Sequence, residues 1–153
     1  MKQLSVYYAL AYLCGLFLNA SLVLIVLLSW AIDDLPFWFR LLFAIAPFFF
    51  TLVGYYVRKD SPDIGLTESL RAALLQCGVM LIPGVALALA VPDSVLCWFV
   101  FPVAGDFAAA FGSIAVWKPL YSILGAVGAP LLFFLGTLLY PALHPEKNPS
   151  HTE

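Results

Sequence analysis

The sequence predicts an all-α, polytopic integral membrane protein: a helical bundle with five transmembrane helices. Of its 153 residues, 63% are hydrophobic and only 10% are charged, whereas a soluble domain carries about 25% charged residues. The seven basic and nine acidic residues are placed so that long uncharged runs remain between them. Tryptophan and tyrosine, which gather at membrane–water interfaces, flank these runs at intervals that fit a membrane crossing.

An α-helix needs about 20 apolar residues to cross a hydrocarbon core ~30 Å thick. The uncharged runs that reach this length directly are 3–32, 72–92 and 119–145. We therefore expect one transmembrane domain over residues 1–141 and a polar, disordered tail at 142–153. The five expected spans are 7–30, 37–57, 68–91, 95–117 and 119–141.

The first span has Tyr7 and Tyr8 at one interface and Trp30 at the other. Its apolar run is much longer than the ~7–15 residues of a signal-peptide core, so we interpret it as a retained helix. The second span becomes long enough when Arg40 extends its guanidinium to the headgroups from near the helix end. Trp38 and the Tyr55–Tyr56 pair mark its two interfaces, and a proline at 47 predicts a kink.

The connection 58–67 is the longest between spans, and it begins with Arg58 and Lys59. Thr67 is the expected N-cap of the third helix, with Glu68 near the positive end of the helix dipole. Arg71 follows Glu68 by three residues and can pair with it on the same face. We interpret Arg58, Lys59, Glu68 and Arg71 as a solvated cytoplasmic patch; the alternative is a docking surface for a cytoplasmic partner.

The fourth span joins two short uncharged runs through Asp106, and its Trp98 and Trp117 are 19 residues apart, about 28 Å of helix. The alternative is four spans plus a re-entrant segment at about 95–117 that turns at 102–106, where proline and glycine can break the helix.

Tyr121 and Tyr140 flank the fifth span with the same spacing. Its small residues offer a packing surface to a neighbouring helix in this chain or in a second copy. They are Gly125, Gly128, Ala129 and Gly136.

Lysine and arginine favour the cytoplasmic side of short loops. Five spans with a cytoplasmic amino terminus give five basic residues inside (Lys2, Arg58, Lys59, Arg71 and Lys118) against Arg40 and Lys147 outside. We therefore expect a plasma membrane protein (the inner membrane, in a bacterium) with its carboxyl terminus outside. The re-entrant alternative exchanges Lys118 and Lys147 and keeps the same count.

Asp106 is the one charge placed near the middle of a span, where an acid costs roughly 2.5–3.5 kcal/mol on insertion scales. Such residues usually face a bundle interior or a water-filled cavity. Ser113 shares its helix face, and Asn19 and Gln76 are polar residues of other spans that can meet it. We expect a hydrogen-bonded Asn19–Gln76–Asp106 core, which is either interhelical packing or an ion or proton site.

The sequence lacks the residue patterns that several kinds of functional site require. Both histidines, His144 and His151, are in the tail, and the three cysteines form no CxxC pair. We expect no metal site, no cofactor, no catalytic constellation and no nucleic-acid binding.

The lipid bilayer is the expected partner, together with another membrane protein or a second copy bound through small-residue helix faces. The predicted function is a non-enzymatic subunit, assembly factor or accessory component of a membrane complex, or a homo-oligomer; the alternative is a transporter or channel component that uses Asp106, Gln76 and Asn19.

Overall fold

A computed structural model describes residues 2–28, 36–90, 103 and 118–145, and every regular element in these residues is a helix. The helices are α1 (Lys2–Leu28), α2 (Phe37–Ile45), α3 (Phe48–Asp60), α4 (Leu66–Ala90) and α7 (Lys118–Leu143). Three stretches are long and apolar enough to cross a membrane: Phe37–Asp60, Leu66–Leu87 and Ile123–Leu143. The all-helical class and the membrane character are therefore confirmed, whereas the count of five spans is not.

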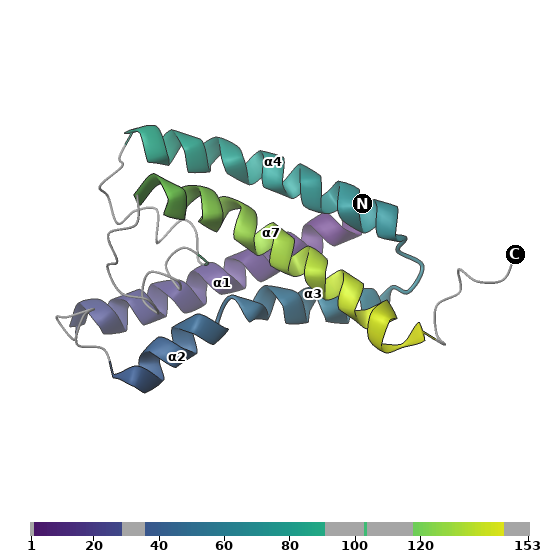
Figure 1. Cartoon of the computed structure of the whole chain (residues 1–153), viewed down its shortest axis with the longest axis horizontal. Coiled ribbons are helices and arrows are strands. Elements are labelled where there is room, and N and C mark those ends of the chain that lie inside the picture. The colour runs from purple at the N-terminus through teal and green to yellow at the C-terminus, as the bar shows by residue number, and fades with distance from the viewer. Residues whose placement is uncertain (1, 29–35, 91–102, 104–117, 146–153) are drawn as a thin grey trace, which may run out of the picture.

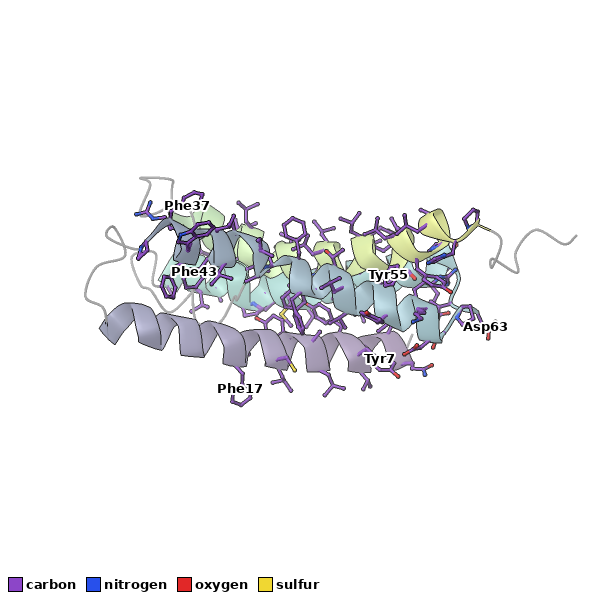
Figure 2. All side chains as sticks on the ribbon, turned by 90° about the horizontal axis from the view of Figure 1, so that it is seen from below. Tyr7, Phe17, Phe37, Phe43, Tyr55 and Asp63 are labelled. Atoms are coloured by element: carbon purple, nitrogen blue, oxygen red, sulfur yellow. The ribbon has the colours of Figure 1, made fainter. Side chains whose placement is uncertain are left out.

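The central helix of the bundle is α7, which packs extensively against α3 on one side and α4 on the other (Figure 1). A fourth helix, α1, covers one face of this layer and lies mainly against α3 (Figure 2). The start of α1, the connection between α3 and α4, and the last turn of α7 share one end of the bundle, which we call the loop end. At the opposite end lie the last turns of α1 and α4 and the first turns of α2 and α7.

The predicted boundaries differ from the observed ones most at the first two spans. The helix predicted at 7–30 begins five residues earlier, at Lys2. The span predicted at 37–57 is divided into α2 and α3. The spans predicted at 68–91 and 119–141 agree with α4 and α7 to within two residues. The span predicted at 95–117 lies outside the described residues except for Val103.

The break between α2 and α3 occurs at Pro47, as its ring chemistry predicts. Proline has no backbone N–H to donate to the preceding turn, so the regular hydrogen-bond ladder cannot pass through it. The helix resumes through two tighter bonds, from Phe49 N to Ala46 O (3.0 Å) and from Phe50 N to Pro47 O (3.2 Å). These three-residue bonds are of the 3₁₀ type, which is common where a helix begins. By contrast, α4 and α7 continue through Pro83 and Pro130.

The connection from α3 to α4 is a short turn closed by a bond from Ile64 N to Ser61 O (3.3 Å). The first turn of α4 is closed by a bond from Ser69 N to Gly65 O (3.0 Å). Gly65 therefore occupies the N-cap position, and the expectation that Thr67 caps the helix was wrong. Glu68 lies in the first turn as expected, where its charge is favourable near the helix dipole.

The core is formed where α1, α3, α4 and α7 converge, and it also contains Val103. Val103 is 0% exposed. Its Cγ1 atom lies 3.0 Å from the position that a Cβ atom would take on Gly128 of α7. A described residue of the predicted fourth span thus lies inside the bundle.

Candidate functional site

Gln76, on the inward face of α4, is a buried polar residue in the described interior. Ala72 and Gln76 are buried and Met80 packs against the core, as their four-residue spacing predicts. Gln76 is 6% exposed, and neither its amide nitrogen nor its amide oxygen has a hydrogen-bond partner among the described residues. A buried amide without a partner costs roughly 1–3 kcal/mol. Within the described part of the bundle, this side chain therefore has unused donor and acceptor capacity.

Tyr8 of α1 is another buried residue that carries a polar group, and sequence reasoning missed its burial. It was assigned to the membrane interface, but it is only 4% exposed. Its ring packs edge-on against Phe133 of α7 with centroids 5.5 Å apart, and 6.4 Å from Phe50 of α3. Its hydroxyl has no hydrogen-bond partner among the described residues, and it lies close enough to Cys77 of α4 to interact electrostatically.

A signal for the burial of Tyr8 was present in the sequence. Leu4, Tyr8, Ala11 and Gly15 recur at the four- and three-residue intervals of a single helix face, and all four are buried. This face includes two small residues, Ala11 and Gly15. Helical periodicity was therefore a better guide to the position of Tyr8 than the preference of tyrosine for interfaces.

Two threonines add hydroxyl groups to the interior, and they behave differently. The hydroxyl of Thr137 donates to Phe134 O of its own helix at 2.7 Å, which is the usual way for a threonine inside a helix to satisfy its hydroxyl. The hydroxyl of Thr51 on α3 is buried without a partner among the described residues. The helices α1, α3 and α4 thus each contribute at least one buried polar side chain that has no hydrogen-bond partner among the described residues.

The predicted Asn19–Gln76–Asp106 core stays a prediction. Asp106 and Ser113 lie outside the described residues, as does the side chain of Asn19. On the backbone of α1, Asn19 is 11 residues beyond Tyr8, which is about 16 Å of helix. Asn19 is therefore well separated along α1 from Tyr8, which interacts electrostatically with Cys77 of α4.

The cytoplasmic patch predicted from residues 58–71 is only partly a solvated surface. Lys59 and Arg71 are exposed, and the Lys59 ammonium lies 5.6 Å from the centroid of the Tyr56 ring. Arg58, in contrast, is 8% exposed, and its Nη1 atom has no partner among the described residues. Asp63 interacts with Arg58 electrostatically.

Glu68, the remaining member of that patch, lines a pocket of about 280 Å³ at the loop end. Gln3 and Leu4 of α1 and residues 60–64 complete the wall, and Figure 2 shows Asp63 at the tip of this end. The pocket brings carboxylates of the connection close to the first turn of α1. No group of three histidine, cysteine or acidic side chains in the described part of the chain is arranged to hold a metal ion.

The last turns of α3 and α7 are joined at the loop end by an aromatic cluster. The hydroxyl of Tyr55 and Nε2 of His144 are hydrogen-bonded at 3.1 Å. The Tyr140 ring packs edge-on against Tyr55 with centroids 5.4 Å apart. His144 was assigned to the disordered tail, but its backbone N–H continues the helical pattern by donating to Tyr140 O at 3.0 Å.

The outward faces of the helices carry large apolar side chains, as a lipid environment requires. Leu89 of α4 is 80% exposed, and Phe17 of α1 is 76% exposed. Figure 2 shows Phe17 pointing away from the bundle. On α2 and α3, exposed Trp38 and Tyr56 are 18 residues apart, about 27 Å of helix, which is close to the thickness of a hydrocarbon core.

No family model, no curated protein and no solved structure matches this chain. The fold and the apolar outer surface define its class as a helical membrane protein, and the interior polar groups are the features on which a more specific role depends.

Proposed function

We propose that this protein is a non-enzymatic component of a membrane assembly, acting as a subunit, an assembly factor or an accessory partner, or as a homo-oligomer. The observation that supports this proposal is the position of α2. Among the described helices, α3 and α4 pack extensively against α7 and α1 lies mainly against α3, whereas α2 has no comparably extensive contact with any of them. Only Phe43 of α2 is buried, and this helix leans away from the bundle (Figure 1).

The occupant that we propose for the free side of α2 is a second membrane helix. Its exposed residues include both aromatic anchors and aliphatic side chains, which favour packing against another helix as well as against lipid. They are Phe37, Trp38, Leu41, Leu42 and Ile45.

Cross-linking in native membranes tests this role. Leu42→Cys in a background without native cysteines is expected to form a cross-linked product whose mass identifies either a second copy or one specific membrane protein. Leu74→Cys on the exposed face of α4 is the matched control, since Leu74 is similarly exposed. Equal cross-linking at the two positions, or none at Leu42→Cys, would contradict a specific contact through α2.

A transporter or channel component is the second candidate, and Gln76 is the observation that favours it. A buried amide whose polar atoms both lack a partner among the described residues has the donor and the acceptor that a passing polar solute or ion needs. In this role Asp106 would be the charged member of the path. Asp106→Asn separates the two proposals: a packing role predicts unchanged assembly, and a conducting role predicts lost or pH-insensitive flux in reconstituted vesicles.

A further inference from the structure

The direction of α7 relative to its neighbours limits how the chain can cross the membrane. Gly136 of α7 meets α3 beside Thr51 and Tyr55, and His144, just beyond α7, is bonded to Tyr55. The carboxyl ends of α3 and α7 therefore meet at the loop end, and these two helices are parallel. Since α4 follows α3 through a short turn, α4 begins at the loop end and finishes at the opposite end (Figure 1).

Ala90, at the end of α4, and Lys118, at the start of α7, consequently lie at the same end of the bundle. A helix that crossed the whole membrane between them would deliver the chain to the loop end. In that case α7 would have to begin at the loop end and run antiparallel to α3. The observed direction of α7 is the reverse, so the connection leaves and returns on the same side.

Val103 shows how far this connection enters the bundle. It contacts Gly128, which follows the first residue of α7 by ten residues, or about 15 Å of helix. This depth is about half of a ~30 Å hydrocarbon core. The connection has 12 residues before Val103 and 14 after it. As helix these would extend about 18 Å and 21 Å, enough to reach the middle and too short to cross.

We propose that α4 ends and α7 begins on the same side of the membrane, with Val103 at mid-depth between them, so that both termini of the chain lie on the same side. The complete burial of Val103 within the bundle supports this mid-depth position. This topology does not depend on the proposed function.

The side that both termini share is the cytoplasmic side. The basic residues at the ends of the crossings are divided five to two between the two sides, and the richer side is cytoplasmic by the positive-inside rule. The five on the side of the termini are Lys2, Arg58, Lys59, Arg71 and Lys147, and the other two are Arg40 and Lys118.

Labelling of single cysteines tests the topology directly. In a full-length chain with its three native cysteines changed to alanine, Ser61→Cys, Lys118→Cys and Ser150→Cys are treated with a membrane-impermeant maleimide in right-side-out and inverted vesicles. We expect Ser61→Cys and Ser150→Cys to react from the cytoplasmic side and Lys118→Cys to react only from the other side. Reaction of Ser150→Cys from the side opposite to Ser61→Cys, or of Lys118→Cys from the same side as Ser61→Cys, would overturn the proposal.

A second measurement addresses the depth of Val103. Gly128→Ala places a methyl group against the Val103 side chain and is expected to lower the midpoint of thermal unfolding in detergent by about 2–4 °C. Val103→Ala makes room for this methyl group, so the double variant is expected to recover part of the loss. If the effects of the two substitutions simply add, Val103 does not contact Gly128 in the membrane and the mid-depth position is wrong.

Discussion

Gly54 of α3 and Gly136 of α7 lie backbone to backbone at the crossing of the two helices. A Cβ atom built on Gly54 would lie 3.2 Å from the Cα atom of Gly136 and would collide with the carbonyl oxygen of Phe133. A Cβ atom on Gly136 would likewise collide with the carbonyl oxygen of Thr51. Because the obstacles are backbone atoms, no change of side-chain rotamer can relieve them. Small residues at such a crossing let membrane helices approach closely.

Gly54→Ala and Gly136→Ala are therefore each expected to destabilise the folded protein by about 1–3 kcal/mol or more. The measurement is thermal unfolding in a fixed detergent. Gly78→Ala on α4 is the matched control, since nothing lies within 4 Å of its Cβ position and alanine has the higher helix propensity. Equal effects at positions 54 and 78 would mean that the close crossing does not exist.

Gln76→Met is expected to raise the free energy of unfolding by about 1–3 kcal/mol, because it replaces a buried amide that has no hydrogen-bond partner in the described part of the chain with an apolar side chain of similar length. Denaturant or thermal titration of both proteins provides the comparison. A loss of stability would instead show that the amide is hydrogen-bonded in the membrane. If Gln76 serves a path for polar solutes, the same variant loses flux while it gains stability, a trade-off common at functional sites.

Tyr8→Phe keeps the ring contacts with Phe50 and Phe133 and removes a hydroxyl without a described partner. We expect it to change stability by less than about 1 kcal/mol, with a slight gain. Tyr8→Ala removes the ring as well and is expected to cost about 3–5 kcal/mol. Two unfolding curves distinguish the roles of ring and hydroxyl; a large loss in Tyr8→Phe would show that the hydroxyl has a strong partner.

Tyr55→Phe is expected to remove the bond to His144 at a cost of about 0.5–1.5 kcal/mol. The effect is local, so amide hydrogen exchange in the last turn of α7 is a more sensitive readout than global unfolding. Tyr56→Phe is the control on the neighbouring residue, which contacts Lys59 rather than α7. Faster exchange in both variants, or in neither, would argue against the link between α3 and α7.

The sequence was sufficient for the helical membrane class because this depends on composition and on the intervals between charges. It also predicted the break at Pro47 and the inward face of Gln76, both of which follow from local geometry. Only the contribution of α7 to the close α3–α7 crossing was predicted. The small residues of α7 were recognised as a packing surface, but Gly54 of α3 was not. A single glycine in an otherwise large-residue helix becomes meaningful only when its partner helix is known.

Tyr8 and Arg58 show why the remainder of the candidate site was beyond sequence reasoning. Both were assigned by the average behaviour of their residue types, tyrosine to an interface and arginine to a solvated patch. Their burial depends on which neighbouring helices cover them, and this is a property of tertiary packing. The direction of α7 has the same origin, since positive-inside counting assigns equal scores to both topologies.

The break at Pro47 divides one crossing into α2, with nine residues, and α3, with 13 residues. These lengths are about 14 Å and 20 Å. Only α3 is held by the glycine crossing, and Phe43 is the one buried residue of α2, so a change in the tilt of α2 disturbs fewer buried side chains than a change in the tilt of α3. We expect the protein to adjust its hydrophobic length in this way to bilayers of different thickness, absorbing hydrophobic mismatch in one short helix instead of through the whole bundle.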